Sequence, residues 1–96
     1  MNNSTLSTPL PNSALAFKME PSAGSHIDRC FDEAVGVVRM TGIVVHFTFN
    51  EVFCGVRPCD VCATDDAQLG VKQIFVRNYH REATSKSSHK ICYANP

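Results

Sequence analysis

Apolar side chains recur every three or four residues between positions 26 and 39, which is the spacing of one face of an α-helix. The apolar positions on that face are Ile27, Cys30, Phe31, Ala34, Val35 and Val38. Ser25-His26-Ile27-Asp28 has the form of a capping box with aspartate in place of glutamate, and Arg39 suits the negative end of a helix. The pattern predicts an amphipathic helix over residues 26–39 that packs its apolar face against the rest of the domain.

After this segment, the period of the hydrophobic pattern changes to two residues. From Ile43 to Phe49, β-branched and aromatic residues alternate with polar ones, which is typical of a strand with one buried face. Asn50-Glu51 has the length of a tight turn, and asparagine tolerates the positive φ that such turns need. The apolar run that follows stops at Pro58, which cannot donate to a sheet. These features predict a β-hairpin from residue 43 to residue 57.

A third patterned segment begins at Thr64, a residue suited to capping a helix. The next two residues are aspartates, which are favourable at the positive end of a helix. An apolar stripe at helical spacing follows, made of Ala67, Val71, Ile74, Phe75 and Tyr79. Gly70 weakens this helix, and residues 72–77 also fit a strand, so residues 71–79 are predicted as helix with strand as the alternative.

The two ends of the chain have little apolar patterning. Residues 1–24 are rich in Asn, Ser, Thr, Pro and Ala, which predicts a disordered N-terminal arm. Residues 82–90 are polar, which predicts a loose C-terminal tail. The fold prediction is therefore a single small α+β domain over residues 25–96, in which the N-terminal helix packs on a β-hairpin or small antiparallel sheet and a second helix follows. Its predicted core contains Phe31, Val35, Val45, Phe47, Phe49 and Phe75.

Composition limits the setting in which this domain works. The chain has 96 residues, and none of its apolar runs approaches the roughly 20 residues of a membrane helix, so no membrane partner is expected. The N-terminal segment lacks the apolar stretch of a secretory signal, which predicts a cytoplasmic protein. In a reducing cytoplasm the five cysteines are expected to be thiols or metal ligands rather than disulfides.

Two short motifs of cysteine and histidine are the best candidates for a metal site. Cys59 and Cys62 form a C-x-x-C, and His89 and Cys92 form an H-x-x-C. Two residues between ligands suit a tetrahedral zinc, so these four residues are candidate ligands of a structural zinc, the one cofactor considered. The alternative is that Cys30 and Cys54 are core residues and that the other three cysteines are surface or half-buried thiols.

Charge is divided unevenly along the chain, although the formal net charge is zero. Residues 1–69 contain four basic and eight acidic residues, whereas residues 70–96 contain five basic residues and one acidic residue. The basic segment is either a surface for nucleic acid or an acidic protein, or a partner of the acidic first helix within the same domain. Catalysis is not expected, because the sequence shows no nucleophile loop, phosphate-binding glycine loop or paired carboxylates.

The stretch Val45-His46-Phe47-Thr48-Phe49-Asn50-Glu51-Val52, followed by Val56-Arg57-Pro58, resembles the hairpins of small bacteriophage and prophage proteins. This resemblance implies a small phage-type accessory protein, a class that includes anti-CRISPR inhibitors of host defence.

Two functions follow from these observations. The first is a non-enzymatic interaction protein, such as a phage-encoded inhibitor of a host defence complex in the host cytoplasm, with Lys72, Arg77, Tyr79 and Arg81 as partner-binding residues. The second is a zinc-stabilised nucleic-acid-binding module that uses the basic C-terminal segment. A homo-oligomer is compatible with so small a core.

Overall fold

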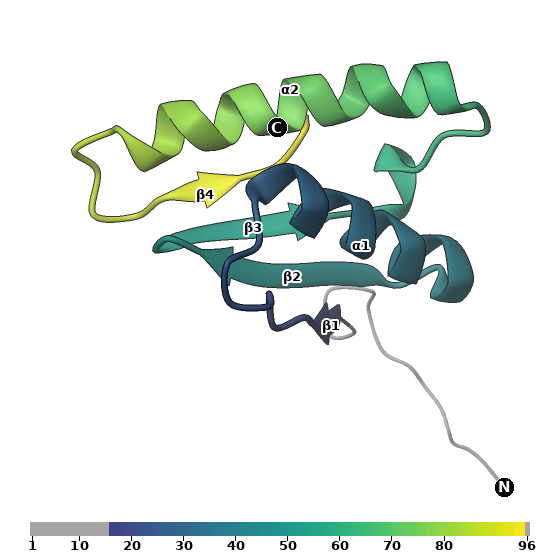
Figure 1. The fold of residues 1–96 in the computed structure, drawn as a ribbon, viewed down its shortest axis with the longest axis horizontal. Coiled ribbons are helices and arrows are strands. Elements are labelled where there is room, and N and C mark those ends of the chain that lie inside the picture. Colours follow the sequence, from purple (N-terminus) through teal and green to yellow (C-terminus); the bar gives the residue numbers. More distant parts are fainter. Residues whose placement is uncertain (1–15, 96) are drawn as a thin grey trace, which may run out of the picture.

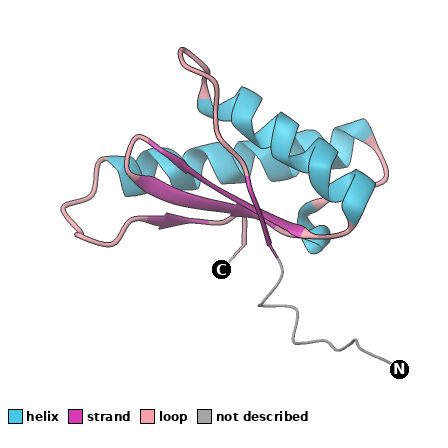
Figure 2. Cartoon of the chain, turned by 90° about the horizontal axis from the view of Figure 1, so that it is seen from below, coloured by secondary structure: helices cyan, strands magenta, loops and turns pink. Residues whose placement is uncertain are grey.

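Two helices and four strands make up the part of the chain that the computed structural model describes, residues 16–95. In chain order they are β1 (Ala16–Lys18), α1 (Ile27–Thr41), β2 (Val44–Phe49), β3 (Val52–Val56), a short 3-10 helix (Pro58–Asp60), α2 (Asp65–Ala83) and β4 (Ile91–Cys92). The strands lie in the order β1-β2-β3-β4 in one sheet (Figure 1). Both helices cover the same face of that sheet (Figure 2). The predicted α+β class is therefore confirmed, as two layers.

Helix α1 confirms the first predicted element and extends it by two residues at its C-terminal end. The predicted capping box is wrong, because the N-cap is His26, whose side chain makes no capping hydrogen bond, and Ser25 lies outside the helix. The helix ends at Gly42, whose backbone is left-handed (φ 71°) and whose N–H donates to the Val38 carbonyl at 2.7 Å. Glycine adopts this conformation without the steric cost that other residues incur, which fixes the end of the helix.

The predicted hairpin is confirmed in its register and in its turn. Strands β2 and β3 are antiparallel, with Phe47 opposite Cys54. Asn50 and Glu51 both have positive φ, 49° and 68°, as the two central residues of a tight hairpin turn require. The turn therefore brings the apolar positions of both strands to the same face of the sheet.

Residues 65–83 form a single helix, so the strand alternative for residues 71–79 is wrong. The Thr64 hydroxyl accepts a hydrogen bond from the Ala67 N–H at 3.2 Å, which is the predicted N-cap. Of the predicted stripe, Phe75 and Tyr79 are buried, whereas the other three members are only half-buried or exposed. The partly buried Val71, Val76 and Ala83 add to the contact between this helix and the core.

The core lies between the helices and the sheet, as predicted. Phe75 of α2 is in contact with Phe31 of α1 and Phe47 of β2, with ring centroids 4.8 Å and 6.4 Å apart. Five of the six predicted core residues are buried, and the sixth, Phe49, is partly buried and packs against them. Cys30 and Cys54 are also fully buried, in agreement with the apolar alternative for these two thiols.

The structure corrects the prediction of a disordered arm over residues 1–24. Ala16–Lys18 form β1, which pairs in parallel with β2, and the Met19 N–H donates to the His46 carbonyl at 2.8 Å. Three residues are too few to show a strand period in the sequence, which is why the pattern missed them. The rest of the predicted arm, residues 1–15, lies outside the described residues.

The predicted loose tail, residues 82–90, is corrected at its start, because α2 continues to Ala83, and the chain that follows the tail is fixed to the sheet. Ile91–Cys92 form β4, which pairs in parallel with β3, and both Cys92 and Ala94 are buried. The sheet is therefore mixed rather than antiparallel. Burial of two small side chains against α2 and β3 explains why a mostly polar segment is fixed at the edge of the sheet.

Candidate interaction surface

Within residues 16–95, both helices lie on one face of the sheet, and we call the opposite face the outer face. Side chains alternate along a strand, so residues one position away from the core residues lie on this face. They are Ala16, Lys18, Val44, His46, Thr48, Phe53, Gly55, Ile91 and Tyr93. Phe53 and Ile91 are directly paired on β3 and β4, and their exposed fractions are 39% and 53%. A rigid sheet therefore presents two large apolar side chains next to each other to solvent.

Aromatic rings extend this apolar pair across the outer face. The His46 ring lies 4.8 Å from the Phe53 ring and 6.5 Å from the Tyr93 ring, measured between centroids. Burial lowers the pKa of His46 below its ordinary value, which favours the neutral imidazole. The centre of the outer face is therefore aromatic and uncharged.

The Tyr93 ring packs closely on the sheet at Gly55, which has no side chain. A Cβ atom added at Gly55 would overlap the Tyr93 ring, so the ring occupies space that only glycine leaves open. The Arg57 guanidinium lies over the same ring, with its central carbon 4.7 Å from the ring centroid. Arg57 also donates to the Asn95 carbonyl, and its Nε lies 3.5 Å from the buried Asp60 carboxylate. These contacts fix the C-terminal segment before any partner binds.

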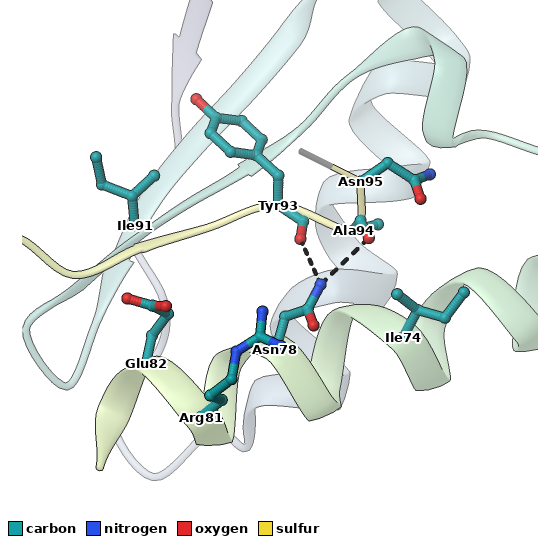
Figure 3. Close-up of a pocket in the computed structure, with 8 residues that line it drawn as sticks. All are labelled: Ile74, Asn78, Arg81, Glu82, Ile91, Tyr93, Ala94 and Asn95. Atoms are coloured by element: carbon teal, nitrogen blue, oxygen red, sulfur yellow. Dashed lines mark hydrogen bonds between the residues drawn. The ribbon is translucent and has the colours of Figure 1, made fainter. Parts of the chain in front are cut away.

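A groove of about 550 Å³ lies beside the outer face, between helix α2 and strand β4 (Figure 3). It is lined by Ile74, Asn78, Arg81, Glu82, Ile91, Tyr93, Ala94 and Asn95. The Asn78 amide donates to the backbone carbonyls of Tyr93 and Ala94, at 2.9 Å and 3.2 Å, and links the C-terminal segment to the helix in the middle of the groove (Figure 3). The groove and the outer face share Ile91 and Tyr93, so they form one continuous surface.

The four residues predicted to bind a partner have different positions. Arg77 and Arg81 are exposed, and Arg81 lines the groove whereas Arg77 does not. Tyr79 is only 4% exposed and its hydroxyl accepts a hydrogen bond from the Asn50 amide, so it is a core residue rather than an exposed anchor. The Lys72 ammonium lies 2.9 Å from the Asp32 carboxylate of α1. Part of the basic segment thus pairs with the acidic first helix, as the intramolecular alternative predicted.

The structure does not bring the four predicted zinc ligands together. Cys59 is exposed and Cys62 half-buried near the 3-10 helix, whereas Cys92 is buried in the core beside Cys54. Within residues 16–95, no three His, Cys, Asp or Glu side chains form a group that could hold a metal ion. The C-x-x-C segment is fixed by Gln68 instead, which accepts from the Cys62 N–H and donates to the Asp60 carbonyl, each at 2.8 Å.

The pKa values of two buried thiols are raised, which makes these thiols less reactive. Burial, with a smaller contribution from the Glu33 and Asp28 carboxylates, raises the pKa of Cys30. A hydrogen bond with Cys92, together with burial, raises the pKa of Cys54. Because the thiolate is the reactive form, these core thiols are expected to be inert in the folded protein.

Thiol labelling tests this arrangement. In the native protein, Ellman's reagent is expected to modify Cys59 first and Cys62 more slowly, and all five cysteines only after unfolding. Addition of a zinc chelator should leave the native labelling pattern unchanged. Modification of Cys92 at the rate of Cys59 in the folded state would show that β4 is not docked on the sheet.

Sequence reasoning missed Phe53, Ile91 and Tyr93 as surface residues. The hairpin period contained a signal for Phe53, because this large apolar residue falls between two inward positions, Val52 and Cys54. For Ile91 and Tyr93 no signal was available, since their face depends on a strand of only two residues.

Comparisons with known proteins found no match to this chain among family models, curated protein sequences or solved structures. No helix in the described range 16–95 combines the length and the apolar character needed to cross a bilayer.

Proposed function

We propose that this chain is a non-enzymatic protein-interaction domain that binds its partner through the outer face of its sheet. The observation that carries the proposal is the exposed pair Phe53 and Ile91, held side by side on a rigid, helix-free face. Exposed apolar side chains grouped in this way, with an aromatic among them, are typical of surfaces that another protein covers. The neighbouring rings of His46 and Tyr93 enlarge the same apolar area.

The charge on this face favours a protein partner over a nucleic acid. Lys18 is the one exposed cation among the outer-face residues, because Arg57 is occupied by Asp60, Asn95 and the Tyr93 ring. Binding to a phosphate backbone requires several cations on the contact surface. The zinc-stabilised alternative also loses support, since its four ligands are not assembled.

Inhibition of a larger complex is the mode of action that this surface suits. An inhibitor has only to occupy its partner's working surface, and it needs no catalytic group to do so. The resemblance of residues 45–58 to phage hairpins makes a bacterial defence complex, such as a CRISPR effector, the first partner to test. Such an inhibitor would act in the cytoplasm of the host cell.

Paired variants test the proposal. Replacing Phe53 and Ile91 together by threonine keeps strand-forming residues but removes the apolar pair, and truncation of central anchors typically costs about 2–4 kcal/mol of binding. Capture of host proteins from a bacterial lysate, measured by quantitative mass spectrometry, should fall at least about tenfold. The folded state should persist, as judged by circular dichroism.

The matched control replaces Met40 and Leu69 by serine, since both are exposed apolar residues on the helices. This control should capture the same partner at the wild-type level. Equal capture by the threonine variant and the wild type would refute the outer face as the binding surface. Salt-dependent binding of wild type to DNA or RNA, lost in the threonine variant, would replace the protein partner by a nucleic acid.

A further inference from the structure

Strand β4 leaves one pair of backbone groups directed away from the sheet. The Lys90 carbonyl accepts a hydrogen bond from the Phe53 N–H at 2.8 Å, so Lys90 directs its backbone toward β3. In a strand, successive residues direct their backbone groups to opposite sides. The N–H and C=O of Ile91 therefore point toward the free edge, where the sheet has no further strand among the described residues.

The groove beside α2 lies along this edge. In the middle of the groove the Asn78 amide already occupies the Tyr93 carbonyl, so the open part of the edge is centred on Ile91. Arg81 and Glu82 form the helix side of this part, and Ile74 lies beyond Asn78 (Figure 3). A free strand edge next to a helix is the arrangement in which an extended peptide adds as an extra strand and places alternate side chains against the helix.

The charge of the groove selects among possible peptides. Arg81 is exposed, makes no ion pair with any residue of the described range, and is the one cation that lines the groove. Glu82, the one acidic residue of the lining, lies on the same wall and disfavours a second carboxylate next to it. The complementary ligand is therefore an extended segment with a single carboxylate aligned on Arg81 and apolar residues on either side of it.

We propose that the free edge of β4 binds an extended acidic segment of the partner protein, which pairs with the Ile91 backbone and places a carboxylate at Arg81. This inference rests on the proposed function and specifies the chemistry of the partner. A second copy of this chain fits less well, because a two-fold interface would place the same cationic segment against itself. The partner's strand would continue the sheet beside Ile91, at the edge that adjoins the outer face.

A displayed library of short random peptides, selected on the immobilised full-length chain, is the probe. Selected sequences should be rich in strand-forming residues and should contain an aspartate or glutamate. A synthetic copy of the best sequence should shift the amide resonance of Ile91 in a nitrogen-15 NMR spectrum. Methylation of the peptide's backbone nitrogens on one edge should remove that shift, because it removes the donors that pair with β4.

Two arginine variants provide the matched comparison. Arg81→Glu should weaken the selected peptide by about tenfold or more, since it removes a charge-assisted hydrogen bond and introduces repulsion. Arg77→Glu makes the same change on the same helix but outside the groove, and should alter the affinity by less than about twofold. Selection of peptides without an acid, an unmoved Ile91 resonance, or equal binding to the Arg81→Glu variant would each overturn the inference.

Failure of this inference can be separated from failure of the proposed function. Suppose that no selected peptide pairs with Ile91, while the variant with threonine at positions 53 and 91 still loses its partner. The outer face would then remain the proposed binding surface, and strand addition at β4 would be refuted. If acidic peptides bind at Ile91 while that variant captures its partner at the wild-type level, partner binding through the outer face would be refuted instead.

Discussion

Replacement of Phe47 by alanine is expected to lower the free energy of unfolding by about 3–5 kcal/mol. Phe47 is 1% exposed on the inner face of β2, and its ring lies 6.4 Å from that of Phe75, the residue that joins α2 to the core. Truncation removes these contacts and leaves a cavity that the sheet cannot close. Because small domains are stable by only about 5–15 kcal/mol, much of the stability is lost.

Urea denaturation followed by circular dichroism measures this loss. Thr48→Ala is the control, because Thr48 is the next residue of the same strand but is exposed on the outer face; it should change stability by less than about 0.5 kcal/mol. A loss below about 1 kcal/mol for Phe47→Ala would show that the inner face of β2 does not carry the core.

Replacement of Asp60 by alanine should cost about 2–3 kcal/mol, although the residue is charged. Asp60 is 1% exposed, its carboxylate accepts a hydrogen bond from the Arg57 N–H at 2.9 Å, and the Arg57 Nε lies 3.5 Å away. Without the carboxylate, the part-buried backbone N–H of Arg57 loses its acceptor and the guanidinium loses its counter-ion. Arg57 also supports Tyr93 and Asn95, so the C-terminal segment is expected to loosen as well.

Asp60→Asn separates the two contributions, since an amide oxygen still accepts from the Arg57 N–H but carries no charge. This variant should retain part of the stability, in thermal melts run beside Asp65→Ala, an exposed control at the start of α2. Equal stability of Asp60→Ala and the wild type would mean that the 3-10 helix and Arg57 do not anchor the end of the chain.

The long elements of this fold were predictable because their patterns are local. Fifteen residues of α1 and nineteen of α2 each present several turns of apolar period, and the turn at Asn50-Glu51 identifies its hairpin by itself. Strands β1 and β4 contain three and two residues, so no period exists to detect. They form because the hairpin offers two open edges, which is information about the tertiary structure rather than about their own sequence.

The same distinction explains the candidate site. The spacing of Cys59, Cys62, His89 and Cys92 suggested a zinc site, but whether two motifs meet depends on the path of the chain between them. That path buries Cys92 in β4 and leaves Cys59 exposed near the 3-10 helix. The exposed pair Phe53 and Ile91 likewise exists only because β4 pairs with β3.

Site-specific photo-crosslinking tests the central claim, that the outer face contacts a protein partner, most directly. Benzoylphenylalanine replaces one aromatic residue with another at Phe53, and the same group at Leu69, an exposed position of α2, is the control. On irradiation in a bacterial lysate, the probe at position 53 should form one specific adduct with a host protein, and the probe at position 69 should not. An adduct formed from position 69 and absent from position 53 would contradict the account, because the partner would then bind the helical layer.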